Sequence, residues 1–241
     1  MDHFTRLAAT PSRIQVEVVS ISWEGCYNSH LGYGRIQGSS LSERPHCIGD
    51  LHSLGRRRTH LLGTQDRTVK VWRAEDGILC GNLTGHAHWI NTLAINTDYA
   101  LRTSCFDPKN GCEQPANDEE AAATATRRYA DALRTAGGVE RLVSGSDDYT
   151  MFLWTPAAAK TCTAKMVGHQ QQVNQVAWSA DSLLIVSGSA DSTLKVWELE
   201  TRRLRFDLPG HGDEVFTVDW SPEGTKVVSG GKDKLLRLWK Q

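Results

Sequence analysis

Hydrophobic and polar positions alternate most clearly toward the end of this 241-residue chain. Short runs of β-branched and aromatic residues lie at 215–220, 227–229 and 236–239, and the turn sequence Ser-Pro-Glu-Gly separates the first two runs. Alternation with a period of two residues, bounded by turns, predicts short strands joined by hairpins. We therefore expect this part of the chain to be all-β.

The same pattern occurs twice with a fixed offset. The segment from Gly168 to Trp197 returns 42 residues later as the segment from Gly210 to Trp239, and each copy places a Trp 28 residues after a His. A repeat of about 40 to 45 residues that opens with Gly-His and closes near a Trp is typical of a WD40 β-propeller blade. One blade cannot bury both of its faces alone, so such blades stack around an axis.

Four residue types recur at fixed distances inside the repeats. An Asp lies six residues before each of four closing Trp residues, and a Ser lies ten residues before three of them. This set resembles the WD40 tetrad, in which the four side chains form hydrogen bonds within one blade, as buried polar groups require. The predicted tetrads are His86, Ser144, Asp148 and Trp154; His169, Ser187, Asp191 and Trp197; and His211, Ser229, Asp233 and Trp239.

The same Ser, His and Asp residues also suggest a catalytic triad. However, the set recurs once per repeat, each time with a Trp, and the chain has no G-x-S-x-G nucleophile motif. The six cysteines have no paired metal-ligand spacing. The sequence therefore predicts that the protein is not an enzyme and has no cofactor and no metal site.

Residues 1–62 do not follow the repeat. Residues 18–23 resemble an inner strand, but Ile14 stands where the His is expected, and residues 24–62 show no period. Repeat sequence then resumes suddenly at Gly63, with Leu62 at the position of the tetrad Ser. We expect an irregular segment with one strand remnant at 1–62, in which 24–62 is either a disordered loop or mis-translated sequence, and a partial propeller at 63–241.

The repeat that begins at His86 is interrupted by an insertion, expected at 104–140. His86 and Trp154 are 68 residues apart instead of 28. Asn117 can cap a helix that starts with acidic residues, continues with an Ala-rich run and stops at Gly137-Gly138. This predicts a helix over about 118–135, which is either a tolerated loop excursion or a docking element.

The charge of the whole chain adds little to this interpretation. The formal net charge is −1, so no overall field favours a nucleic acid or an anionic membrane. The N-terminus has no apolar core of signal-peptide length, and no run of residues approaches a membrane span. These features and the scattered cysteines predict an intracellular protein.

Several stretches together resemble the Notchless family of large-ribosomal-subunit assembly factors. They are QDRTVKVWRAEDG, GHAHWINTLAINTDYALRT, RLVSGSDDYTMFLW, SADSTLKVWELE and DLPGHGDEVFTVDWSPEGTKVVSGGKDKLLRLW, within about 63–241. The resemblance includes the insertion after Ala-Leu-Arg-Thr. It implies a WD40 propeller. In the family that this chain resembles, we expect an N-terminal ubiquitin-like domain followed by an eight-bladed propeller.

This chain departs from the family pattern. Three blades carry all motifs and a fourth only its end, so the expected fold class is an all-β, incomplete WD40 propeller with one helical insertion. The sequence ends two residues after Trp239, and no clear candidate supplies an outer strand for the last blade. The ubiquitin-like domain is absent from the sequence, so we expect no contact with the AAA+ ATPase midasin.

The resemblance implies a non-catalytic scaffold in large-subunit assembly, located in the nucleus and nucleolus, with the cytoplasm as an alternative. Its partners would be pre-ribosomal proteins, with ribosomal RNA as a further candidate, and no membrane. Candidate contact residues lie three positions after each tetrad His: Trp89, Gln172 and Glu214. Alternatives are an adaptor in Notch signalling or in protein degradation, or a gene fragment without a function, because one fold serves many roles.

Overall fold

The computed structural model describes residues 5–7, 15–19, 48–54, 57–73, 77–103, 105–106, 117–157 and 161–240, with side chains from Leu61 onward. Nearly all of the described elements are short antiparallel strands, as the alternating pattern predicts. They form four sheets, which we number I to IV along the chain. The described part of the chain thus has the all-β character that the sequence predicts.

Sheets I to III are four-stranded meanders, and sheet IV has three consecutive strands to which two strands from the start of the chain are added. Sheet I contains β3 (Ile48–Leu54), β4 (Arg57–Gly63), β5 (Thr68–Arg73) and β6 (Leu79–Thr84). Sheet II contains β7 (Ile90–Ile95), β8 (Leu142–Ser146), β9 (Thr150–Trp154) and β10 (Ala164–Val167). Sheet III contains β11 (Val173–Trp178), β12 (Leu184–Ser189), β13 (Thr193–Glu198) and β14 (Arg203–Pro209). Sheet IV contains β15 (Val215–Trp220), β16 (Lys226–Gly231), β17 (Leu236–Lys240), β2 (Gln15–Val19) and β1 (Thr5–Leu7).

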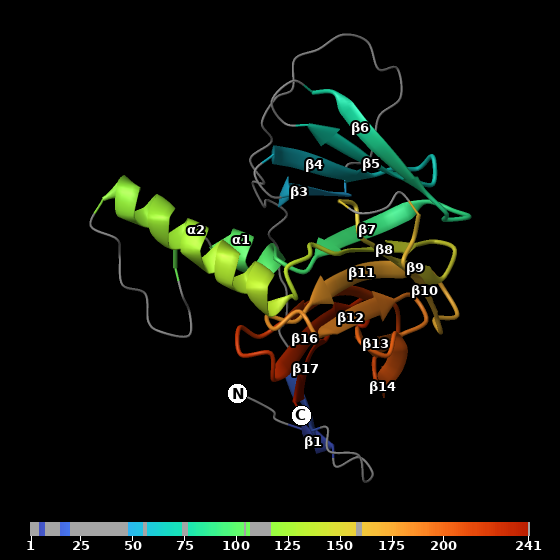
Figure 1. Cartoon of the computed structure of the whole chain (residues 1–241). Helices are drawn as coiled ribbons and strands as arrows, with labels where there is room; N and C mark the ends of the chain where they lie inside the picture. Colours follow the sequence, from blue (N-terminus) through green and yellow to red (C-terminus); the bar gives the residue numbers. More distant parts are fainter. Residues whose placement is uncertain are drawn as a thin grey trace.

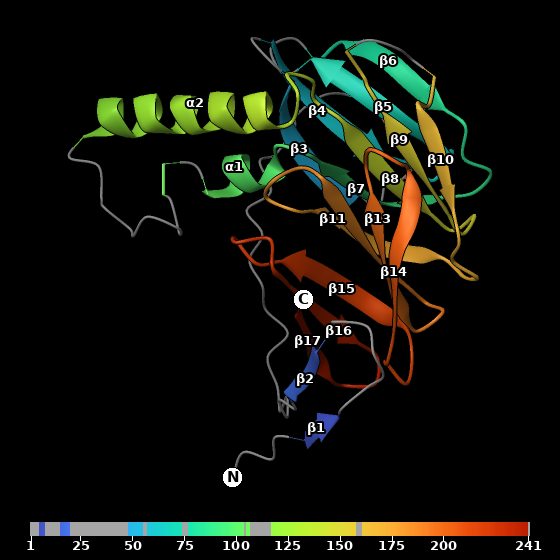
Figure 2. The same ribbon diagram turned by 60° about the horizontal axis from the view of Figure 1, so that its bottom comes forward.

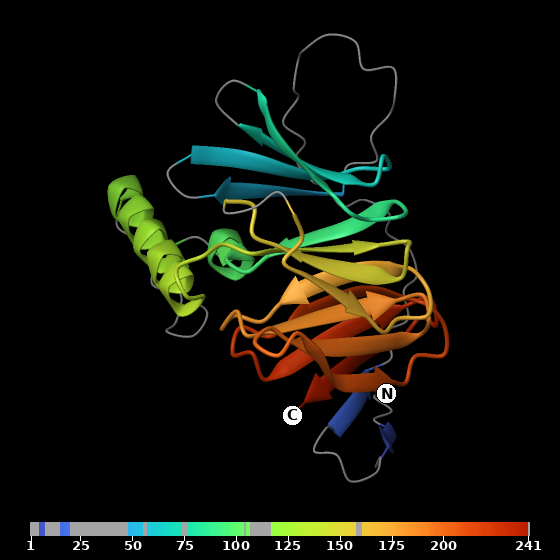
Figure 3. The same ribbon diagram turned by 45° about the vertical axis from the view of Figure 1, so that its right-hand side comes forward.

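The sheets stack face to face through their first strands. β7 packs beside β3 and β11, and β11 packs beside β15. Sheets I and IV lie at opposite ends of the stack, as Figures 1 and 3 show. The four sheets therefore form an arc of propeller blades instead of a closed ring, and the prediction of an incomplete all-β WD40 propeller is confirmed.

A separate hydrophobic core fills the space between each pair of neighbouring sheets. Val69 and Leu83 of sheet I pack against Ile95 and Trp154 of sheet II, for example. Equivalent cores lie between sheets II and III and between sheets III and IV. Each fully buried Val, Leu or Ile contributes about 1.5–3 kcal/mol by leaving water, so a sheet inside the stack is stabilised on both faces.

The prediction that the last blade lacks an outer strand is wrong. β2 pairs with β17 in antiparallel register, from Val19 opposite Leu236 to Gln15 opposite Lys240. The alternating sequence Gln-Val-Glu-Val-Val suits a strand that adds to a sheet edge. The interpretation of 18–23 as an inner-strand remnant is therefore wrong for residues 18 and 19, and residues 20–23 lie outside the described part.

The prediction of irregular sequence up to residue 62 is also wrong for its last part. β3 and β4 occupy 48–54 and 57–63, and β4 pairs with β5 from Thr59 opposite Arg73 to Gly63 opposite Val69. The expected boundary at 62/63 thus falls inside β4. Pairing with the well-patterned β5 overrides the weak local preference of this segment, since strand formation depends strongly on context. The two alternatives for 24–47 concern residues outside the described part.

The described part of the insertion between β7 and β8 forms α1 (Asp98–Thr103) and α2 (Asp118–Thr135). The Asn117 side chain caps α2 by accepting a hydrogen bond from the backbone N–H of Glu120 at 2.8 Å. Gly137 and Gly138, both with positive φ, follow its C-terminal end. Figure 2 shows α2 to one side of the sheets, with α1 nearer to them. This is the helix that the sequence predicts over about 118–135.

Candidate functional site

Three of the four sheets contain a complete Asp-His-Ser-Trp tetrad with nearly the same geometry. In sheet III, His169 Nδ1 lies 2.9 Å from Asp191 Oδ2, and His169 Nε2 lies 2.7 Å from Ser187 Oγ. The indole Nε1 of Trp197 donates to the same Ser187 Oγ at 2.9 Å. The other two tetrads agree with these distances to within 0.1 Å; they are His86, Ser144, Asp148 and Trp154 in sheet II, and His211, Ser229, Asp233 and Trp239 in sheet IV.

The hydrogen-bond directions within a tetrad follow from its chemistry. The Trp indole can only donate and the Asp carboxylate can only accept, so a neutral imidazole donates from Nδ1 to the Asp and accepts from the Ser hydroxyl at Nε2. Asp191 Oδ1 accepts from the backbone N–H and the hydroxyl of Thr193. Asp191 Oδ2, which faces the His, also accepts from the backbone N–H of Gln170. Each buried polar group of the tetrad thus has a hydrogen-bond partner, which offsets the cost of burying it.

The Ser-His-Asp connections are those of a hydrolytic triad, but the serines are closed to substrate. Ser144 and Ser187 are 0 % exposed and Ser229 is 1 % exposed. The Trp indole N–H already occupies each Oγ. A nucleophilic Ser needs an acyl carbon within reach of Oγ and donors for the resulting oxyanion. The three tetrads therefore connect the strands of each blade, with no access for an acyl substrate.

The tetrads hold their carboxylates in the ionised form. Burial by itself would raise the pKa of Asp148 and Asp191, but hydrogen bonds from the tetrad His, a Thr and a backbone N–H outweigh it and hold the pKa of both well below the usual range. Burial also opposes a lowered pKa at Asp233, but hydrogen bonds from the backbone N–H groups of Gly212 and Leu235 and from His211 lower it. Burial lowers the pKa of His211, although Asp233 opposes this effect. A neutral His beside a charged Asp is therefore the stable state of the sheet IV tetrad.

Sheet I lacks this tetrad. Leu62 occupies the position of the Ser, so the Trp72 indole has no Ser acceptor there, and Trp72 is partly exposed. Asp66 instead accepts hydrogen bonds from Thr64 and Thr68 and pairs with Lys70 at 2.6 Å. Burial opposes the change, but these contacts lower the pKa of Asp66. Sheet I thus has the four strands of a blade but not the hydrogen-bonded tetrad.

Trp89 is the most exposed of the three predicted contact residues, at 47 %. It lies in the loop before β7, where its ring contacts the ring of His88 and its carbonyl accepts from the backbone N–H of Asp147. That hydrogen bond joins its loop to the β8–β9 turn, which carries Tyr149, 48 % exposed with a φ of 68°. We call Trp89, His88 and Tyr149 the aromatic patch. Tyr149 directly follows the tetrad Asp148 but is not among the contact residues that the repeat pattern predicts.

The other two predicted contact residues are less available. Gln172 is half-buried, and its backbone carbonyl accepts from Ser189 and Ala190. The Glu214 carboxylate pairs with Lys232 at 3.2 Å. The arc thus carries its aromatic surface on sheet II and only polar groups at the matching positions of sheets III and IV.

The insertion also links two sheets that are not neighbours. Arg102 of α1 contacts Asp98 at 2.7 Å and Asp219 at the end of β15, with its guanidinium 3.2 and 3.3 Å from the two carboxylate oxygens. Sheet III lies between these sheets. No spacing rule in the sequence relates Arg102 to Asp219, so sequence reasoning could not find this contact.

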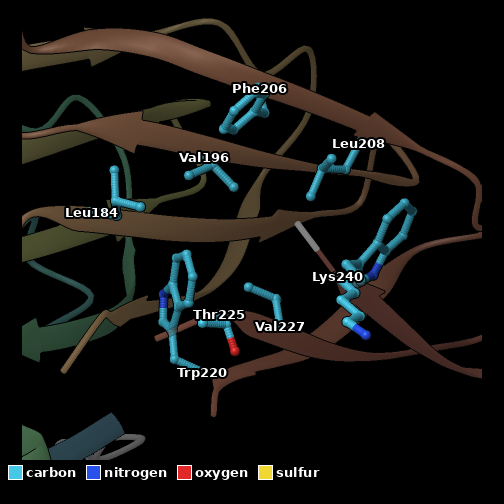
Figure 4. Close-up of a pocket in the computed structure, with 9 residues that line it drawn as sticks. Leu184, Val196, Phe206, Leu208, Trp220, Thr225, Val227 and Lys240 are labelled. Carbon is cyan, nitrogen blue, oxygen red and sulfur yellow. The ribbon is translucent and has the colours of Figure 1, made fainter. Parts of the chain in front are cut away.

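A shallow apolar hollow lies between sheets III and IV, where Val196, Phe206 and Leu208 face Trp220 and Val227 (Figure 4). These residues also belong to the core between the two sheets, so the hollow is a gap in that packing. Within the described part of the chain, no three His, Cys, Asp or Glu side chains come together to hold a metal ion. In the same part, no helix is long and apolar enough to span a membrane.

Comparison with known proteins agrees with this geometry. Residues 160–198 and 202–240, which contain β10–β13 and β14–β17, match the family described as WD domain, G-beta repeat. The chain is similar to Protein Notchless of Drosophila melanogaster, with 46 % identity over 121 residues, which are 49 % of this chain and 24 % of the relative. It is similar to Ribosome assembly protein 4 of Saccharomyces cerevisiae, with 44 % identity over 117 residues, 48 % of this chain and 22 % of the relative.

A third relative is the Notchless protein homolog of Arabidopsis thaliana, with 46 % identity over 88 residues, 36 % of this chain and 18 % of the relative. The chain therefore matches about a quarter or less of the length of these curated relatives. The repeated tetrads and the matched repeats both indicate WD40 blades. Over about half of its length, the chain is similar to proteins of the Notchless and Ribosome assembly protein 4 group.

Proposed function

We propose that the chain is a non-catalytic scaffold that takes part in ribosome assembly by binding protein partners. One of its relatives bears the name Ribosome assembly protein 4. The three tetrads support a structural role for the chemistry-bearing residues, because their serines are buried and fully hydrogen-bonded. The observation that carries the proposal is the aromatic patch on sheet II, which is exposed on a rigid, tetrad-braced blade.

The aromatic patch has the properties of a protein-binding surface. Trp and Tyr dominate the binding energy of protein interfaces because they offer a large apolar area and a polar group at low entropic cost. Trp89 and Tyr149 are both close to half exposed, and neither ring belongs to a core between sheets. The hydrogen bond between their loops fixes their relative position before any partner binds. Such pre-organisation reduces the cost of association.

The proposal extends to the partners and the compartment. The partners are pre-ribosomal proteins of the large subunit, in the nucleus and nucleolus. The near-neutral chain has no overall field for RNA, so we assign RNA contact a secondary role. RNase treatment of captured particles tests it, because a protein-mediated association resists digestion and an RNA-mediated one does not.

Sedimentation of large-subunit precursors from cells that express the tagged chain tests this function. We expect the chain to co-sediment with the precursors. Replacing Trp89 with Ala is expected to reduce the co-sedimenting fraction about tenfold or more, as loss of an interface hot spot does. The matched control is Leu183→Ala, which removes a side chain that is 56 % exposed in the turn between β11 and β12. Equal behaviour of the two variants, or a chain that stays at the top of the gradient, would contradict the proposal.

A further inference from the structure

The interface between neighbouring sheets is built in the same way three times. On its second strand, each sheet presents an aliphatic residue and a glycine to the next sheet: Leu61 and Gly63, Val143 and Gly145, and Val186 and Gly188. The next sheet approaches these glycines closely. A Cβ at Gly145 would lie 2.7 Å from Val173, and a Cβ at Gly188 would lie 2.8 Å from Val218. A side chain at either position would push the sheets apart.

Sheet IV presents the same face, and no other described sheet packs on it. Val228 and Gly230 occupy the positions of Val186 and Gly188, but Val228 is 41 % exposed whereas Val186 is 0 % exposed. The nearest atoms to a Cβ at Gly230 are side chains of its own sheet, Thr217 and Leu236. Leu236 and Leu238 are also partly exposed on this face. We call this surface, formed by Val228, Gly230, Leu236 and Leu238, the free face of sheet IV.

The first strand of sheet IV also differs from those of sheets II and III in the residue that lies toward the next sheet. In sheets II and III, the residue five positions after the tetrad His is an Asn that donates to the first strand of the next sheet. Asn91 donates to the carbonyl of Val173 at 3.1 Å, and Asn174 donates to that of Val215 at 2.8 Å. Phe216 stands at this position in sheet IV and is 50 % exposed. An apolar ring beside an apolar face enlarges a surface that favours association.

Sheet I exposes the opposite half of the same interface. The closing Trp of sheets II, III and IV faces the preceding sheet and is at most 3 % exposed. Trp72 holds this position in sheet I, and both Trp72 and Leu62 are partly exposed. Successive strand residues point to opposite faces, so Leu62 and Trp72 face away from the core that Leu61 and Val69 form with sheet II. Among the described residues, no other sheet packs against this side of sheet I.

We propose that the free face of sheet IV binds sheet I of a second copy of this chain, so that two four-sheet arcs close one ring of eight sheets. The occupant follows from the repeat itself. The two uncovered faces are the two halves of an interface that the chain forms three times, and they lie at opposite ends of the arc (Figures 1 and 3). Propellers contain four to eight blades, and a head-to-tail interface that closes a ring leaves no face uncovered.

The molar mass of the purified full chain in solution tests the proposal. We expect static light scattering to give twice the mass of one chain at high concentration, with dissociation on dilution. Val228→Lys places a charge on the free face and is expected to give the mass of one chain. The matched control, Val167→Lys, changes a Val that is 65 % exposed on β10 and is expected to leave the double mass unchanged. A single-chain mass for the unchanged protein at all concentrations overturns the proposal.

Mixing two variants tests the head-to-tail arrangement. Leu62→Glu charges the opposite half of the interface and is also expected to give the mass of one chain. In a mixed ring of Val228→Lys and Leu62→Glu chains, one interface is unaltered and the other pairs Lys with Glu. We therefore expect the mixture to regain the double mass, whereas a pairing of two sheet IV faces would not be restored. Far-UV circular dichroism checks that each variant is folded, and an unfolded Val228→Lys leaves the Leu62→Glu variant to decide alone: its retention of the double mass overturns the proposal.

Discussion

Sheets III and IV have the same tetrad but different surroundings. The tetrad distances of the two sheets agree within 0.1 Å, and both sheets match the same repeat family. Within the described part of the chain, sheet III packs against a neighbour on each side, whereas sheet IV has a neighbouring sheet on one side. Val186 is consequently fully buried and its counterpart Val228 is 41 % exposed. The tetrad therefore connects the strands within a blade, whereas burial of the faces of the blade depends on the blades beside it.

Truncation of the closing Trp is expected to give the largest difference between an interior and an end sheet. Trp197 is 2 % exposed and donates to Ser187, so Trp197→Ala is expected to lower the free energy of unfolding by about 3–5 kcal/mol. Trp72→Ala is expected to cost less than half as much, because Trp72 is partly exposed and lacks the Ser acceptor. Urea denaturation of both variants measures the difference. Equal losses would show that sheet I is as well supported as sheet III.

Substitution of Val186 and of Val228 is expected to give a smaller difference in the free energy of unfolding between sheets III and IV. Val186→Ala removes two buried methyl groups and is expected to lower the free energy of unfolding by about 2 kcal/mol. Val228→Ala is expected to lower it by less than about 1 kcal/mol, because much of that side chain is already in water. Both are compared by urea denaturation at protein concentrations where the chain is monomeric. A Val228→Ala loss as large as that of Val186→Ala would contradict the exposed face of sheet IV.

The tetrad serines sharpen the comparison by an expected equality. Ser187→Ala and Ser229→Ala each leave a Trp indole N–H and a His nitrogen without their partner, which costs about 1–3 kcal/mol. Since the two tetrads have the same geometry, the two losses should agree to within about 0.5 kcal/mol. A clearly smaller loss for Ser229→Ala would mean that the sheet IV tetrad also depends on its neighbouring sheets.

Acidification is expected to weaken the tetrads in two stages. The pKa of His211 is lowered by burial from an ordinary 6.5, so its contribution to stability is complete above that value and is lost as the pH falls below it. The pKa values of Asp191 and Asp233 are lowered from an ordinary 3.8, so their contribution is complete above 3.8 and is lost as the pH falls toward their folded values. The urea midpoint measured against pH should show both declines. His211→Gln should remove the first decline and keep the second, and an unchanged first decline would reject the assignment.

The tetrads could be predicted from the sequence because each is contained in one repeat. The distances of 28, 10 and 6 residues to the closing Trp fix which side chains meet on adjacent strands of one sheet. Even in sheet II, where the insertion separates His86 from Ser144, the motif identified the partners that the structure brings together. The α2 helix could be predicted for the same reason, since capping and composition are local signals.

Features that depend on distant parts of the chain could not be predicted. β4 carries a weak pattern and becomes a strand by pairing with β5, and β2 pairs with β17 from the other end of the sequence. The contact of Arg102 with Asp219 spans 117 positions and crosses the edge of sheet III. Tyr149 directly follows a tetrad Asp in the sequence, but its exposure depends on the left-handed backbone turn at this position.

Hydrogen exchange of the full chain tests most directly whether burial of a sheet depends on its neighbours. Amides of a sheet covered on both faces open only with large unfolding events, whereas those of a half-covered sheet open locally. At low concentration, we expect the amides of β12 and β13 to exchange much more slowly than those of β16 and β17. At high concentration, the β16 and β17 amides should approach the protection of β12 and β13 as a second copy covers the free face. Equal protection of the two sheets at every concentration would contradict the account.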